Sequence, residues 1–136
     1  MQQLLRRFIL ILSISATVGL IPYKAYATHL AGADISYTCL GGNSYQIDLT
    51  FYRDCSGSYP PNGVTIEFTS VSCNMFFTDV LLRTNNTGNE ITYPCPGLST
   101  TCTDSASSTV PGIQQWHYSG VINFPMQCFD WVISWT

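Results

Sequence analysis

The chain has 136 residues, six cysteines and a formal net charge of −3, and only 10% of its residues are charged. This length suits one domain, and five basic residues are too few for the strongly basic surface with which proteins bind nucleic acid. The positions of the apolar residues along the chain therefore decide the class of protein.

Residues 1–27 are predicted to form a secretory signal peptide. The basic pair Arg6-Arg7 precedes an apolar run over residues 8–21, and Ala25-Tyr26-Ala27 matches the small-x-small pattern of a cleavage site. Cleavage there leaves residues 28–136 as one exported domain. The expected location is secreted, on the cell surface or in the periplasm.

The alternative interpretation of the apolar run is an uncleaved membrane anchor. The run has 14 residues and includes serine and threonine, whereas a membrane-spanning helix needs about 20 mostly apolar residues. We therefore expect no stable membrane span after cleavage. The remaining domain keeps two arginines against eight acidic residues, a formal net charge of −6, so nucleic acid is not an expected partner.

Apolar residues alternate with period two in the first half of the predicted domain. Residues 35–39 favour a strand, residues 40–44 form a glycine-rich turn, and residues 45–52 alternate most clearly, which predicts a hairpin. A long turn-forming stretch over 53–63 predicts a surface loop. Residues 64–69 then predict a third strand with one apolar side.

The second half of the domain contains shorter strand signals. Residues 76–82 favour an extended segment over a short helix, and residues 90–93 predict a short strand. Residues 98–112 are rich in Ser, Thr, Pro and Gly and predict a loop. Two more strands are expected at 115–123 and 129–135.

Six or seven short strands in an exported chain predict an all-β fold, an antiparallel immunoglobulin-like sandwich, with a small irregular barrel as the alternative. The chain stops at Thr136, directly after the alternating Trp131, Ile133 and Trp135. Two indoles on a final strand would form an exposed apolar edge, so we expect the domain to be truncated there. A terminal strand docked in the sheet is the alternative.

All six cysteines follow the predicted cleavage site, so they are expected to form disulfides. Fifteen pairings are open to six cysteines, and local spacing favours Cys95 with Cys102, Cys55 with Cys73, and Cys39 with Cys128. A zinc site would need close pairs of the C-x2-C type, and the sequence contains none. No metal site is therefore expected.

No residue pattern predicts catalysis or a cofactor. His29 near Asp34 could bind a cation, but a terminal histidine and a strand histidine such as His117 are more often structural. The sequence lacks a nucleophile elbow, a paired-carboxylate motif and a phosphate-binding loop. The many tyrosines could form a glycan-stacking platform or pair across strands within the core.

Three ordered motifs carry a family resemblance. Residues 28–37 (THLAGADISY), then 45–55 (YQIDLTFYRDC), then 111–135, which end in CFDWVISW, resemble the N-terminal region of large secreted surface proteins of Bacteroidetes. Ala33 stands where that family usually has a second glycine. The resemblance implies type IX secretion cargo with gliding-motility-associated or PKD-like modules further along, whose C-terminal sorting domain is not in this sequence.

The resemblance implies a non-catalytic extracellular structural or adhesion module, with an unknown glycan or protein as its ligand. One alternative is a carbohydrate-binding module that uses exposed aromatic side chains. The other alternative is a fragment of a secreted hydrolase whose catalytic residues lie beyond Thr136.

Overall fold

The structure, a computed structural model, describes residues 30–135 and consists of strands joined by turns and loops. The predicted signal peptide and His29 lie outside the described residues. The strands are β1 (Leu30–Gly41), β2 (Ser44–Asp54), β3 (Gly63–Ser70), β4 (Met75–Arg83), β5 (Asn89–Glu90), β6 (Ile113–Asn123) and β7 (Val132–Trp135). The predicted all-β fold is confirmed. Within residues 30–135 there is no helix of the length and apolar character needed to span a membrane.

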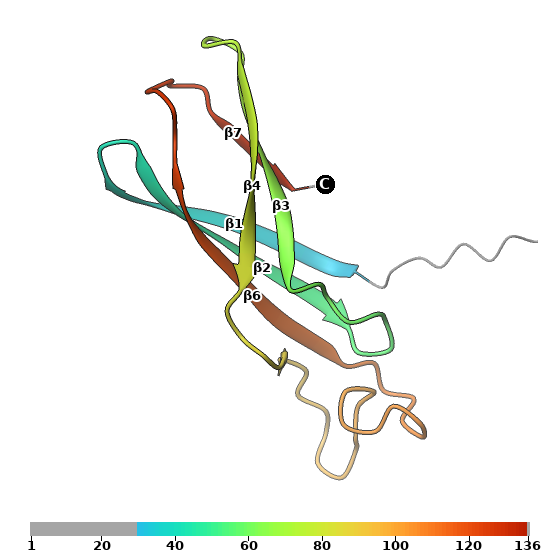
Figure 1. The fold of residues 1–136 in the computed structure, drawn as a ribbon. Helices are drawn as coiled ribbons and strands as arrows, with labels where there is room; N and C mark the ends of the chain where they lie inside the picture. Colours follow the sequence, from blue (N-terminus) through green and yellow to red (C-terminus); the bar gives the residue numbers. More distant parts are fainter. Residues whose placement is uncertain (1–29, 136) are drawn as a thin grey trace, which may run out of the picture.

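All seven strands belong to one antiparallel sheet in the order β1-β2-β6-β4-β3-β7, with β5 paired to β6. The sheet curls into a half-barrel: β1, β2 and β6 run side by side, and the β3–β4 hairpin crosses them with β7 at its far edge (Figure 1). The two layers expected for a sandwich are thus two parts of one curled sheet.

The sheet bends sharply between β6 and β4. These strands share only two paired positions, Leu82 with Ser119 and Arg83 with Tyr118. Gly120 lies at this bend, where an added Cβ would come within 2.9 Å of the Leu81 side chain. Glycine therefore lets the two layers approach each other at the point where the sheet folds over.

The core lies between the two layers. Alternate residues of β2, β3 and β6 point into it, as period-two patterning requires, and Phe124 closes one end. The fully or nearly buried apolar side chains are Ile47, Leu49, Val64, Ile66, Phe68, Leu81, Trp116, Tyr118, Ile122 and Phe124.

Several element boundaries differ from the prediction. β1 begins at Leu30, because it pairs with β2 over almost its whole length as one side of a hairpin. The expected strand over 90–93 is reduced to β5, and β7 begins only at Val132. β7 docks against β3, and Trp135 packs edge-on against Phe51, with ring centroids 5.5 Å apart. The indole of Trp135 is therefore half-buried and does not form the exposed apolar edge that we expected.

The three expected disulfide pairings are wrong. The structure joins Cys55 to Cys102 and Cys73 to Cys128, and Cys39 and Cys95 are free and exposed. The amide of Cys55 donates to the carbonyl of Gly112, which brings the 91–112 loop beside the end of β2. The order of the strands therefore decides the disulfides: β2 pairs with β6 beside Cys55–Cys102, and β3 pairs with β7 beside Cys73–Cys128. Two disulfides are typical of proteins in oxidising, non-cytoplasmic compartments.

Candidate binding groove

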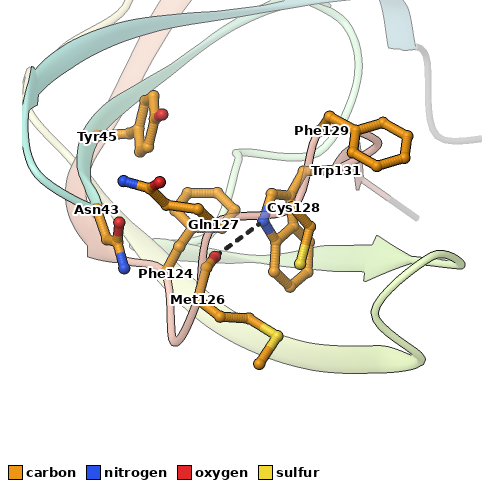
Figure 2. Close-up of a pocket in the computed structure, with 8 residues that line it drawn as sticks. All are labelled: Asn43, Tyr45, Phe124, Met126, Gln127, Cys128, Phe129 and Trp131. Carbon is orange, nitrogen blue, oxygen red and sulfur yellow. Dashed lines mark hydrogen bonds between the residues drawn. The ribbon is translucent and has the colours of Figure 1, made fainter.

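A groove opens between the β1–β2 hairpin and the segment that connects β6 to β7 (Figure 2). It consists of two adjoining pockets with volumes of about 340 and 240 Å³, which share five lining residues. The shared residues are Tyr45, Phe124, Cys128, Phe129 and Trp131. One pocket adds Asn43, Met126 and Gln127, and the other adds Tyr37 and Ile133.

The 124–131 segment forms one wall of the groove and is fastened at several points. The Cys73–Cys128 disulfide ties it to the β3–β4 turn, and the amide of Phe124 donates to the carbonyl of Asn43 at 2.9 Å. Trp131 Nε1 donates to the carbonyl of Met126 at 3.4 Å, as Figure 2 shows. The wall is thus joined to both neighbouring hairpins, by a disulfide to one and by a hydrogen bond to the other.

Asp130 attaches this wall to the end of β3 as well. Its carboxylate accepts hydrogen bonds from the Ser70 hydroxyl at 2.5 Å, and from the Ser72 hydroxyl at 2.5 Å and amide at 2.7 Å. The Ser70 hydroxyl contributes most to lowering the pKa of Asp130 to about 2, because these donors favour the ionised form. The carboxylate therefore remains an acceptor well into the acidic range.

Tyr37, on the inner face of β1, lines one side of the groove, and the second half of this face is uncovered. Residues directly opposite each other on antiparallel strands share a face, so Ile35 and Tyr37, which pair with the buried Leu49 and Ile47, point to the core side. Yet Tyr37 is 66% exposed and Cys39, on the same face, is also exposed. β1 therefore presents an apolar inner face with nothing packed over its second half.

The aromatic rings of the groove meet edge to face. Tyr37 contacts Tyr45 with an interplanar angle of 67°, Tyr45 contacts Phe124 at 79°, and Phe124 contacts Trp131 at 63°. A platform for stacking sugar rings needs aromatic faces presented together. The rings instead form an edge-to-face aromatic lining, and Phe124 connects this lining to the core.

The groove is electrically neutral. None of the side chains that line its two pockets is charged, although the described residues carry eight carboxylates against two arginines. Asp34, the only charged residue of β1, pairs with Thr50 and so lies on the opposite face of the strand. An uncharged ligand surface is complementary to this groove.

The opposite end of the sheet carries the two arginines. Arg53 is only 4% exposed, and its guanidinium donates to the carbonyls of Asp54, Cys55 and Gly57 and to Gln114 Oε1. Its Cζ lies 4.3 Å from the centroid of the Tyr59 ring.

The second arginine extends this cluster towards the core. Tyr59 packs edge-on against Trp116, with ring centroids 6.2 Å apart, and Arg83 Cζ lies 4.9 Å from the centroid of the Trp116 ring. Trp116 Nε1 is buried without a hydrogen-bond partner. The arrangement uses both arginines to pack aromatic rings, which is a structural role.

His117, which the sequence singled out, and the loop residue Asn85 both lie apart from the groove. His117 is exposed on β6, with its Nδ1 3.3 Å from Thr50 Oγ1. Asn85 ties its loop to β6, because its side chain accepts the amide of His117 and donates to the carbonyl of Gln115. In the described part of the chain, no group of three or more His, Cys, Asp or Glu side chains is placed to hold a metal ion.

Of the six cysteines, only Cys128 lines the groove. The sequence did not predict the groove itself. Its two sides come from the β1–β2 hairpin and the 124–131 segment, which are far apart along the chain. One signal was present: Phe124, Met126 and Phe129 are apolar residues in a segment that includes Pro125 and lies between two strands. No protein-family model, curated protein or solved structure matches the chain.

Proposed function

We propose that the protein is a non-catalytic extracellular structural or adhesion module, exported by its N-terminal segment and belonging to the N-terminal region of a secreted Bacteroidetes surface protein. The motifs in residues 28–37, 45–55 and 111–135 support the family, and the two disulfides support an exported domain. The contact surface for the ligand is the groove.

One observation carries this proposal: an uncharged groove lined by aromatic rings lies beside a covalently fastened wall. The side chains that line it are aromatic, aliphatic, sulfur-containing or amide, the mixture of apolar surface and a few polar groups that is typical of ligand-binding pockets. An exposed apolar surface of this kind marks an interaction site.

A localisation experiment tests the first half of the proposal. The full chain with a C-terminal epitope tag would be expressed in a Gram-negative host, which would then be fractionated by osmotic shock. We expect tagged protein of reduced mass outside the cytoplasm, with four oxidised and two titratable cysteines. Retention in the cytoplasm at full length with six reduced thiols would contradict the proposal.

An adhesion assay tests the second half. Beads coated with the exported protein are expected to adhere to bacterial cells or extracellular matrix more strongly than beads coated with the reduced, unfolded protein. Equal adhesion of both preparations would contradict an adhesion role for the folded domain.

Carbohydrate binding is the second candidate function. The amides of Asn43 and Gln127 beside aromatic rings favour it, because amides are common hydrogen-bonding partners of neutral polar ligands. The edge-to-face arrangement of the rings counts against it. Binding of neutral glycans on an array, with competition by free glycan at the groove, would support it.

A further inference from the structure

We propose that the groove binds an extended polypeptide segment, which adds a strand to the open seam of the half-barrel. This inference rests on the proposed function, since both take the groove as the contact surface. The seam is the gap between β1 and β7, the first and last strands in the order of the sheet.

Both strands at the seam have a free edge. β1 pairs only with β2, and β7 pairs only with β3, within the residues that the structure describes. A free edge presents a row of backbone donors and acceptors, and another strand is the partner that satisfies such a row in register. The backbone at the seam therefore specifies an extended peptide.

β1 lacks the devices that protect edge strands from pairing. Its 12 residues contain no lysine and no proline, and its single charge, Asp34, lies on the outer face. The strand shows register shifts only near its two ends, between Leu30 and Gly32 and between Cys39 and Gly41. The stretch between them is regular and open to an added strand.

The residues around the seam determine which side chains the added strand would carry. A strand added there would place alternate side chains on the inner face, beside Ile35 and Tyr37 of β1 and near Ile133 of β7. Because no charged side chain lines the groove, uncharged residues are favoured at those alternate positions, and the neighbouring Ile35 and Ile133 favour apolar ones. The occupant is therefore a segment with period-two apolar alternation and no charge on its inward side.

The probe is a displayed library of random peptides of about ten residues, long enough for one average strand with flanks. It would be selected on the exported, disulfide-intact protein. We expect the selected peptides to share period-two apolar alternation, and a synthetic peptide of the selected sequence to bind in calorimetry. Selection of no peptide, or of peptides without alternation, would overturn the proposal.

Two matched variants locate the binding site. Tyr37→Lys places a charge in the neutral groove at a residue that is 66% exposed, and Val121→Lys makes a similar change at a residue that is 57% exposed on β6. Val121 pairs with Gln46, on the outer face of the sheet. We expect Tyr37→Lys to weaken peptide binding roughly tenfold or more, as for a central contact residue, and Val121→Lys to leave it unchanged. Equal effects would overturn the proposed site.

Hydrogen exchange identifies the binding mode. Strand addition is expected to slow exchange of the β1 amides that point away from β2, and the same measurement on both variants reports whether each is folded. Peptide binding without this protection would overturn strand addition.

Binding of neutral glycans, with loss at Tyr37→Lys and with no selected peptide, would assign the groove to a sugar. Bead adhesion that persists in Tyr37→Lys while peptide binding is lost would refute strand addition as the basis of adhesion and leave the adhesion role intact. If beads coated with the wild-type protein do not adhere but the selected peptide binds, the adhesion role is refuted and strand addition stands.

Discussion

Each of the two ends of the curled sheet (Figure 1) is held by one disulfide, but the two disulfides serve different purposes. At one end, Cys73–Cys128 fastens a wall that keeps a neutral aromatic groove open. At the other end, Cys55–Cys102 fastens the 91–112 loop beside the buried guanidinium of Arg53. A disulfide therefore indicates where a connection is fixed, and the side chains around it decide the chemistry of that end, which is uncharged at the groove and contains a buried cation at the other end.

The largest expected effects come from removing each disulfide in turn. The bonds span 55 and 47 residues, so Cys73→Ala/Cys128→Ala and Cys55→Ala/Cys102→Ala should each lower the free energy of unfolding by about 4 kcal/mol. Urea unfolding of both variants measures the loss.

Hydrogen exchange on the same two variants tests whether only one of the disulfides holds the wall of the groove. The amides of residues 124–131 should exchange faster only when Cys73–Cys128 is removed, because that bond holds the wall of the groove. Faster exchange of the wall in both variants would show that the two ends are coupled, and would contradict the comparison.

The next largest effect is expected within the groove end itself. Phe124 is 6% exposed and its ring contacts Tyr45, Phe68, Phe77 and Trp131, so Phe124→Ala should cost about 3 kcal/mol through a cavity. Thermal or urea unfolding measures it.

Phe129→Ala is the matched control for Phe124→Ala. Phe129 lines the same groove but is 95% exposed, so its removal should change the free energy of unfolding by less than about 0.5 kcal/mol. Similar costs for the two variants would show that the groove is not continuous with the core.

Local patterns predicted the strands but not the groove. The alternation of residues 45–52, 64–69 and 115–123 is a local property, and each became a strand with its apolar side in the core. The groove depends on the pairing of β2 with β6, which brings Asn43 beside Phe124, residues that are far apart along the chain.

The cysteines show the same limit of sequence reasoning. Cys95 and Cys102 are close along the chain, but Cys102 pairs with Cys55 across the end of the sheet, and Cys95 stays free. A six-cysteine sequence leaves the pairing open because contacts between distant segments decide it. The aromatic character of the site was visible in the composition, whereas its neutrality required knowing which face of β1 carries Asp34.

A change at Arg53 tests the opposite end. Arg53→Lys keeps the charge but replaces a planar fork of donors by one ammonium, which cannot reach Gln114 and the carbonyls of Cys55 and Gly57 together. Unsatisfied buried acceptors should lower the free energy of unfolding by about 2 kcal/mol. Urea unfolding measures this loss, and peptide binding at the groove should not change. Reduced peptide binding would contradict the independence of the two ends.

The smallest expected effect is the response of each end to acid, through Asp130 and Asp104. The pKa of Asp130 is lowered to about 2, first by the Ser70 hydroxyl, and the pKa of Asp104 is lowered first by the Ser107 hydroxyl. A carboxyl group with a lowered pKa in the folded state stabilises the fold fully above its ordinary pKa, about 3.8. For Asp130 this stabilisation is lost as the pH falls from about 4 towards 2.

Urea midpoints between pH 5 and pH 2 therefore distinguish the two ends. Wild-type stability should fall over this window, and Asp130→Asn should flatten the fall more than Asp104→Asn. The Asp130 carboxylate joins two distant segments through Ser70 and Ser72, whereas the Asp104 carboxylate accepts from Ala106 and Ser107, which are close to it along the chain. Hydrogen exchange at pH 2.5 should then be faster in residues 124–131 than at pH 5, after correction for the intrinsic rate. An equal flattening by both substitutions would show that the hydrogen bonds of Asp130 to Ser70 and Ser72 add nothing specific to the wall of the groove.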